Sequence, residues 1–228
     1  MNTPPAWLTT VSHLVFLVSS FGVVVPLAIG LRHWRLLFPA GRSIVYYFGF
    51  WTVEALVDQW SRKVLHTNVY LYHVSVLVET WLLGWAYYHT FDLKPVRRIM
   101  PWVALVFTLV ALVDFFILAG PHQLNRVTRA VQVVLMLIMV MLYFEQWTRE
   151  VHTGSPWRNL MFISSVGLAV YYTGSVMGYL LQNGAPTLTQ RIISLLIDST
   201  YNVALVLMTL GLWRETAPPV APDEGPGA

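Results

Sequence analysis

The chain contains no cysteine and few charged residues. None of its 228 residues is Cys, and only 11% are Asp, Glu, Lys or Arg, compared with about 25% in a typical soluble domain. The absence of cysteine excludes disulfides, thiolate nucleophiles and thiolate metal ligands. The low charge, together with 56% hydrophobic residues, excludes an ordinary soluble domain.

Basic clusters are also missing. The pI is about 9.3, but the 14 Lys and Arg residues are scattered at the ends of apolar runs instead of forming a stripe. We therefore expect no nucleic-acid partner. No basic residue precedes the first apolar run, so we expect that run to be retained as a helix and not cleaved as a signal peptide.

Long apolar runs dominate what is present. A membrane-spanning helix needs about 20 predominantly apolar residues, and the chain has seven such runs, at 7–31, 43–65, 69–91, 99–119, 125–147, 157–182 and 190–213. The sequence predicts an all-α, polytopic membrane protein, a seven-transmembrane-helix bundle over residues 1–214, in the inner (plasma) membrane with the lipid bilayer as partner. Residues 215–228 are rich in Pro, Gly and acid, and are predicted to be a disordered cytoplasmic tail.

Charge in the connections predicts an orientation, because loops rich in Lys and Arg stay on the cytoplasmic side. With the N-terminus outside and the C-terminus in the cytoplasm, the inner side carries nine basic residues and the outer side five. The inner set is Arg32, Arg35, Arg42, Lys94, Arg97, Arg98, Arg149, Arg158 and Arg214, and the outer set is Arg62, Lys63, Arg126, Arg129 and Arg191.

Five carboxylates interrupt the apolar runs, namely Glu54, Asp58, Glu79, Asp114 and Asp198. A charged side chain at the centre of a membrane helix costs about 2.5–3.5 kcal/mol on insertion scales, so such residues usually face a cavity or a partner. All five, and the five outer basic residues, map to the middle or outer half of the predicted bundle. The sequence therefore predicts an ion-paired, hydrated interior near the outer surface.

Helical spacing places these polar residues on shared faces. Glu54, Asp58 and Arg62 follow at intervals of four residues, which stacks them on one side of a helix. Arg191, Ser194, Asp198 and Asn202 form a comparable stripe. We expect an outward-facing cavity that binds a small polar solute or ion, lined by Glu54, Asp58, His73, Glu79, Arg129, Asp198 and Asn202. The alternative is that these groups are structural ion pairs and hydrogen bonds.

Two sequence features predict local packing. Gly167, Gly174 and Gly178 recur on one side of a predicted helix, and small residues at such spacing let helices approach closely. Packing within the monomer is the default use of this face, and a homodimer is the alternative. Pro26 in the first run predicts a kink.

The start of the third predicted helix, TNVYLYHVSVLVET, contains Asn68, His73 and Glu79 in an Asn-x4-His-x5-Glu arrangement. It resembles a segment in a set of small bacterial seven-helix membrane proteins, over about 25 residues, and this resemblance implies no particular activity. Asn68 is also well placed to cap the helix start.

The last predicted helix, with LIDSTYNVALVL, is similar to the last helix of microbial rhodopsins. There an aspartate precedes the retinal-bearing lysine by four residues, and Asp198 and Asn202 take these two positions here. A Schiff base needs an amine, and the only lysines are Lys63 and Lys94, near helix ends. Covalent retinal is excluded, and we expect no cofactor.

Motifs for catalysis are lacking. There is no Gly-x-Ser-x-Gly sequence, no phosphate-cradling glycine loop and no tight pair of histidines. We expect a non-enzymatic protein that transports or senses its ligand, with a membrane or cytoplasmic protein partner if it is a sensor. The alternatives are an intramembrane metal-dependent hydrolase, which needs about three ligands and an open water position, and a structural membrane protein without a ligand.

Overall fold

The computed structural model describes residues 5–120, 123, 125–150, 155–181 and 187–216, with the backbone alone for 177–181 and 187. Every regular element in these ranges is a helix, which confirms the all-α prediction. The elements are α1 (Ala6–Phe21), α2 (Val24–Arg32), α3 (Pro39–Val64), α4 (Val69–Thr90), α5 (Lys94–Val113), the π-helix η1 (Asp114–Leu118), α6 (Arg126–Arg149), the 3₁₀ turn η2 (Pro156–Arg158), α7 (Leu160–Leu181) and α8 (Thr187–Thr216).

The first apolar run is one helical rod with a break in it. Gly22 ends α1, and the amide of Val25 donates to the Gly22 carbonyl at 3.1 Å with the three-residue spacing of a turn. Pro26 has no N–H to donate to that carbonyl, so the α-helical ladder is interrupted at this point. The predicted kink at Pro26 is confirmed. Because η1 directly continues α5, the described residues form seven helical rods in all.

Local sequence explains several helix boundaries. Pro39 and Pro95 lie in the first turns of α3 and α5, where a missing N–H costs nothing because those amides have no partner in the helix. Gly120 closes the α5–η1 rod at a φ of 72°, a backbone region that glycine enters without a steric penalty. The predicted boundary at Arg214 is slightly early, since α8 continues to Thr216, and the rest of the predicted tail lies outside the described residues.

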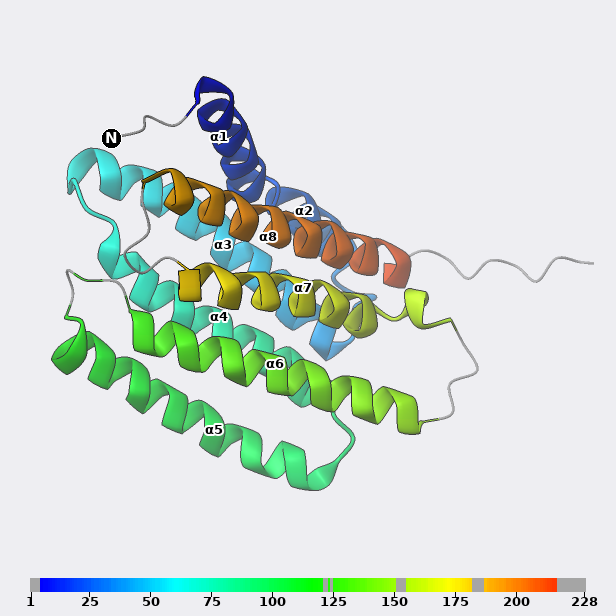
Figure 1. Cartoon of the computed structure of the whole chain (residues 1–228). Coiled ribbons are helices and arrows are strands. Elements are labelled where there is room, and N and C mark those ends of the chain that lie inside the picture. Colours follow the sequence, from blue (N-terminus) through cyan, green and yellow to red (C-terminus); the bar gives the residue numbers. More distant parts are fainter. Residues whose placement is uncertain (1–4, 121–122, 124, 151–154, 182–186, 217–228) are drawn as a thin grey trace, which may run out of the picture.

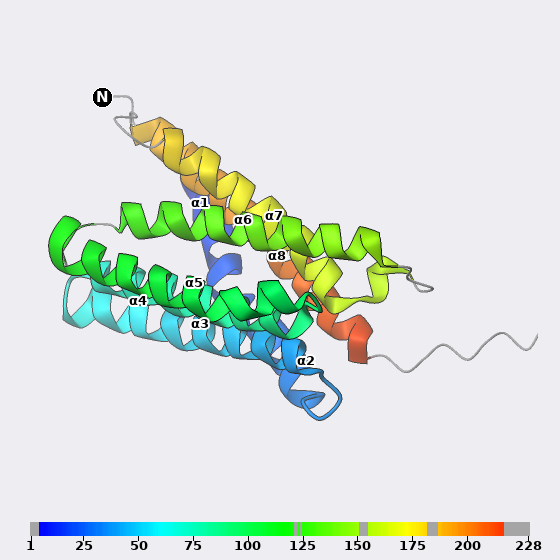
Figure 2. The ribbon, with the colours of Figure 1, turned by 90° about the horizontal axis from the view of Figure 1, so that it is seen from below.

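The rods pack side by side, and successive rods run in opposite directions (Figures 1 and 2). We name the two ends of the bundle by residues in their connections. The Asn68 end holds the α3–α4 connection and the starts of α6 and α8. The Thr90 end holds the α4–α5 connection and the starts of α3 and α7. Helix α5 lies at one edge of the bundle, and α1 crosses α8 at a steep angle at the opposite edge (Figure 1).

Four rods are long and apolar enough to cross a membrane: Ala6–Arg32, Lys94–Leu118, Arg126–Arg149 and Leu188–Thr216. Many of their large apolar side chains face outward, among them Trp102, Ile117 and Met141, each more than 60% exposed. Outward apolar surface on several long helices is typical of a protein whose solvent is lipid. The four helices indicate a multi-pass membrane protein.

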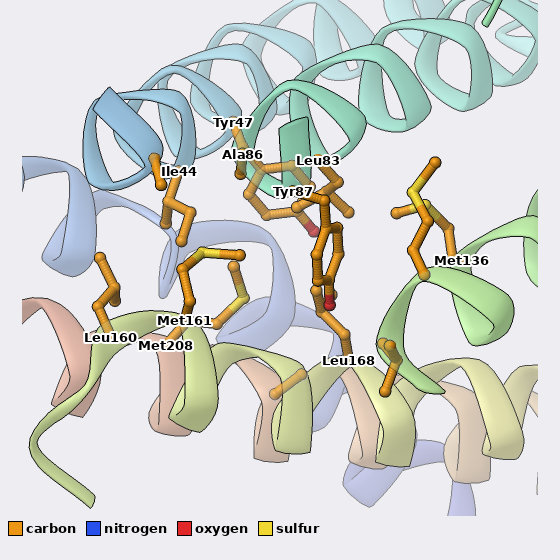
Figure 3. Packing of buried hydrophobic residues seen from close by; sticks show 14 of the residues in the cluster. Ile44, Tyr47, Leu83, Ala86, Tyr87, Met136, Leu160, Met161, Leu168 and Met208 are labelled. Carbon is orange, nitrogen blue, oxygen red and sulfur yellow. The ribbon is translucent and has the colours of Figure 1, made fainter. Parts of the chain in front are cut away.

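A cluster of buried apolar side chains joins the helices of the bundle (Figure 3). Helices α3, α4, α7 and α8 contribute Ile44, Leu83, Met161 and Met208, all 6% exposed or less. Tyr87 stands among them, and its hydroxyl forms a 3.0 Å hydrogen bond with Ser165, so the polar tip of the ring is satisfied. Side-chain packing therefore holds these helices together.

Glycines bring α7 and α8 into close contact. A Cβ on Gly167 would lie 3.0 Å from the Ala204 Cα, and one on Gly174 would lie 2.7 Å from the side chain of Thr200. The glycine face predicted from the sequence is thus occupied within the monomer at these two positions. Gly178 lies on the part of α7 where only the backbone is described.

Candidate functional site

Glu79 on α4 lies in the middle of the bundle and is completely buried. One carboxylate oxygen, Oε2, accepts a bond from Arg129 Nη1 at 2.9 Å and another from Gln132 Nε2 at 2.9 Å. The other, Oε1, accepts a bond from the Tyr172 hydroxyl at 3.1 Å. Three helices, α4, α6 and α7, therefore meet at one carboxylate. We call Glu79, Arg129, Gln132, Tyr171 and Tyr172 the Glu79 network.

Arg129, the cation of this network, also has several hydrogen-bond partners. Arg129 is only 11% exposed in its side chain, and it donates to Gln132 Oε1 at 2.7 Å and to the Tyr171 hydroxyl. The Gln132 amide also donates to the Val76 carbonyl at 3.3 Å. Removing one partner of a buried ion pair leaves the other charge without compensation, which typically costs about 3–5 kcal/mol. A buried ion pair with this many hydrogen bonds to the protein is typical of a structural interaction.

Aromatic rings extend the network toward α3 and α8. Tyr171 contacts Tyr172 at 4.9 Å between ring centroids and Tyr201 at 5.4 Å. Tyr201 in turn contacts Trp51 at 6.3 Å. These ring contacts connect the Glu79 network on α7 with α8 and α3.

Glu54 and Asp58 form a second group, between α3 and α4. Glu54 Oε1 accepts a 3.2 Å bond from Ser75 on α4. Asp58 pairs with Arg62 one turn along its own helix, at 2.9 Å. Of the three residues predicted to stack, Asp58 and Arg62 pair within α3, and Glu54 joins α3 to α4.

Asn68 does not cap α4 through its side chain, contrary to the sequence expectation. It occupies the N-cap position, but its Nδ2 donates to Asp58 Oδ1 at 2.6 Å. A cap would use Asn68 Oδ1 to accept a backbone amide of α4, but the charge-assisted bond from Nδ2 to Asp58 turns the side chain toward α3. Asn68 therefore joins α4 to α3 instead of closing its own helix.

His73 points away from the other predicted site residues. Its Nε2 lies 3.0 Å from the Gln123 carbonyl, and its ring meets Phe115 edge to face. Both partners belong to the α5–α6 side of the bundle. The structure therefore places His73 apart from Glu79, which lies almost two turns further along the same helix.

Asp198 and Asn202 form a third group on α8. Asn202 Nδ2 donates to the Val15 carbonyl of α1 at 3.3 Å. Asp198 is partly buried, and no described residue donates a hydrogen bond to its carboxylate or forms an ion pair with it. A carboxylate in a candidate membrane span without a partner is the exception that a functional site would explain.

Six buried side-chain polar atoms lack a hydrogen-bond partner among the described residues. Three of them lie on α1, α3 and α8, and of the others Arg42 Nε is at the start of α3 and Ser164 and Ser175 are on α7. Within the part of the chain that the structure describes, Ser12 Oγ, Trp51 Nε1 and Asn202 Oδ1 are buried and have no hydrogen-bond partner. A buried polar atom without a partner costs about 1–3 kcal/mol. Several of them together indicate that water or a ligand completes the site.

Asp114 has a structural explanation. It is 1% exposed, begins η1, and accepts bonds from the Thr128 amide at 3.0 Å and hydroxyl at 2.6 Å. A carboxylate that receives amides in the first turn of a helix stabilises that end. Asp114 thus fixes the start of α6 against the end of α5. A surface hollow of about 440 Å³ lies beside it, lined in part by Leu118, Gln123 and Val127.

Sequence reasoning missed the tyrosines of the Glu79 network and the unpaired groups Ser12 and Trp51. One signal was available for the tyrosines, because a Tyr within an apolar helix needs a partner for its hydroxyl. No pattern distinguished Ser12 from the other hydroxyls of α1. Its significance comes from the absence of a partner in the folded chain.

Metal ligands are not grouped. Among the residues that the structure describes, no three His, Asp or Glu side chains lie close enough together to hold a metal ion.

Comparison with known proteins adds no assignment. No protein-family model, curated protein or solved structure matches the chain. The site must therefore be interpreted from its own chemistry.

Proposed function

We propose that this protein is an integral membrane protein that binds a small polar solute or ion between α1, α3 and α8 in the half of the bundle near the Asn68 end, for transport or sensing. The observation that carries the proposal is the unpaired carboxylate of Asp198. Ser12, Trp51 and Asn202 supply further unpaired polar atoms in the same region. The chemistry required is only binding, since no nucleophile or acid–base pair is needed.

The proposal includes seven membrane spans, with the Asn68 end outside and the Thr90 end in the cytoplasm. Helices α3, α4 and α7 have 26, 22 and 22 residues, each long enough to cross a bilayer at 1.5 Å per residue. Helices α3 and α4 direct Glu54, Ser75 and Glu79 toward partners inside the bundle. Their low overall hydropathy therefore reflects inward polar groups and not surface exposure.

The two polar regions have different roles in this proposal. The Glu79 network joins α4, α6 and α7 and serves as a fixed frame. The Asp198 region lies between α8 and the broken rod α1–α2, where one wall can adjust. A ligand that replaces missing hydrogen bonds there would stabilise one arrangement of α1 against α8.

Two alternatives receive less support. An intramembrane metal-dependent hydrolase would need about three converging ligands, and the described residues provide no such group. A purely structural membrane protein would account for the Glu79 network, but it would not account for the cost of leaving Asp198 without a partner.

Cysteine accessibility tests the proposal directly, because the native chain contains no cysteine. We expect Asp198→Cys in membrane vesicles to react with a membrane-impermeant thiol reagent added on the outer side. Leu196→Cys is the matched control. Leu196 lies on the same turn of α8, but its side chain is 43% exposed on the periphery of the bundle, where lipid would surround it. Equal lack of reaction at both positions would contradict the proposed aqueous site.

The same variants separate transport from sensing. A carrier exposes its site to the two sides in turn, so Asp198→Cys would react with reagent from either side. A sensor would react from the outer side only. Orientation is checked with Thr67→Cys and Leu93→Cys, in the α3–α4 and α4–α5 connections, which we expect to react outside and inside respectively. The opposite labelling would reverse the proposed orientation.

A further inference from the structure

Asp198 belongs to a stripe of α8 that faces α1. At about 100° per residue, Arg191, Asp198, Asn202 and Leu205 lie on one side of the helix. Arg191 donates to Thr9 at 3.1 Å, and Asn202 donates to the Val15 carbonyl. Leu205 lies against Gly22, with its Cδ2 2.8 Å from where a Cβ would be. Asp198 lies between the Arg191 and Asn202 contacts, so its side chain is directed at α1.

The part of α1 opposite Asp198 is Thr9 to Val15. Its one buried polar side chain without a partner is Ser12, three residues before Val15 and three after Thr9. Asn202, one turn beyond Asp198 on α8, has its amide nitrogen on Val15 and its Oδ1 unpaired. We call Ser12, Asp198 and Asn202 the Asp198 seam.

The unpaired atoms of the Asp198 seam are oxygens: a carboxylate, an amide carbonyl and a hydroxyl. Among the side chains that the structure describes, no cation compensates them. Arg191 is two turns away, exposed, and bonded to Thr9, and Arg62 is paired with Asp58. The indole N–H of Trp51 is the unpaired donor nearby, but Trp51 meets α8 at Tyr201, outside the stripe.

We propose that the Asp198 seam binds a small monovalent cation, an alkali-metal ion or ammonium. This proposal rests on the proposed function and names its ligand class. One carboxylate with neutral oxygens matches a single positive charge, whereas Ca²⁺ takes six to eight oxygen ligands and usually several carboxylates. The Arg191–Thr9 and Leu205–Gly22 contacts hold α1 against α8 on both sides of the seam, which favours a small ion over a large organic one.

The broken rod α1–α2 supports the same proposal. Interrupted helices accompany ion sites in membrane proteins, and the interruption allows one wall of such a site to move. The interruption at Gly22 contacts Leu205, two turns along α8 from Asp198. Occupation of the seam would therefore fix the angle between α1 and α8.

The test is the thermal unfolding of purified protein in lipid nanodiscs at constant ionic strength. N-methyl-D-glucamine chloride is replaced stepwise by lithium, sodium, potassium or ammonium chloride. We expect a saturable rise in the unfolding midpoint for at least one small cation. Asp198→Asn should weaken its apparent affinity by at least about tenfold, and Ser12→Ala by about threefold, because charge contributes more than one neutral oxygen ligand. Glu145→Gln, an exposed acid at the Thr90 end, should respond as the native protein does.

Two results would overturn the cation proposal: no rise in the unfolding midpoint with any of the four cations, or an unchanged apparent affinity for the cation in Asp198→Asn. The proposed function is judged separately by thiol labelling of Asp198→Cys. Labelling without a cation response would leave a solute site of another class. Failure of both would remove the site altogether.

Discussion

Glu79 and Asp198 are carboxylates in the interior of long helices, and their neighbourhoods differ completely. Glu79 receives bonds from Arg129, Gln132 and Tyr172, and its side chain is 0% exposed. Asp198 is partly buried and has no partner in the described chain. Glu54 is intermediate, with one bond from Ser75.

The difference lies in how each carboxylate is compensated. A charge in lipid must be compensated, and the Glu79 network does so entirely with the protein's own side chains. In the function proposed above, a bound ligand supplies that compensation at the Asp198 seam. Four predictions test this comparison, and they are ordered by expected size.

The largest effect is expected from Arg129→Met. It leaves the Glu79 carboxylate buried without its cation, so the free energy of unfolding should fall by about 3–5 kcal/mol. Thermal unfolding in detergent measures the loss. Adding Glu79→Gln to this variant should recover part of the stability, because the double variant no longer buries a lone charge. A single variant as stable as the native protein would show that Glu79 is not locked.

Gly167→Ala tests the close contact between α7 and α8. The new Cβ would lie 3.0 Å from the Ala204 Cα and 3.2 Å from its carbonyl oxygen, so the backbone of α8 must shift, at a cost of about 1–3 kcal/mol. We also expect a change in thiol labelling of Asp198→Cys in this background. Gly49→Ala is the control, since a Cβ on Gly49 would lie 3.7 Å from its nearest neighbour, Leu27 Cδ1, which is an ordinary contact. An equal loss at Gly49 would indicate a general intolerance of alanine.

Ser75→Ala tests the intermediate case. Glu54 loses the one hydrogen bond that its carboxylate receives, and the expected loss is about 1–2 kcal/mol. Chemical denaturation of the purified protein measures it. Ser194→Ala provides a comparison, because the Ser194 hydroxyl bonds only the Gln190 carbonyl of its own helix at an exposed position. A loss of unfolding free energy no larger than that of Ser194→Ala would show that the Ser75 hydrogen bond does not stabilise the Glu54 carboxylate.

The smallest effect, with the opposite sign, is expected for Asp198→Asn. Without small cations in the buffer, removing an uncompensated charge from a membrane span should leave stability unchanged or raise it by up to about 1 kcal/mol. The measurement is the unfolding midpoint in N-methyl-D-glucamine chloride. A destabilisation comparable with that of Arg129→Met would mean that Asp198 has a structural role like that of Glu79.

The sequence itself determined the class of the protein and the location of its helices. Apolar runs of about 20 residues predict helices wherever they occur, because backbone groups in lipid must bond within their own segment. Pro26 predicted the break between α1 and α2 for an equally local reason. The carboxylates were also visible, since a charge in an apolar run is conspicuous without any structure.

Only the tertiary structure decided which carboxylates have partners. Helical spacing places Glu79 and Asp198 on particular faces of their own helices, but it does not say which helix each face meets. Arg129 and Tyr172 reach Glu79 from 50 and 93 residues away in sequence, whereas Arg191, on the same stripe as Asp198, donates to Thr9 instead. Packing between helices is set by shape over the whole bundle, as at Gly167 and Ala204, and such long-range fit leaves no short pattern in the sequence.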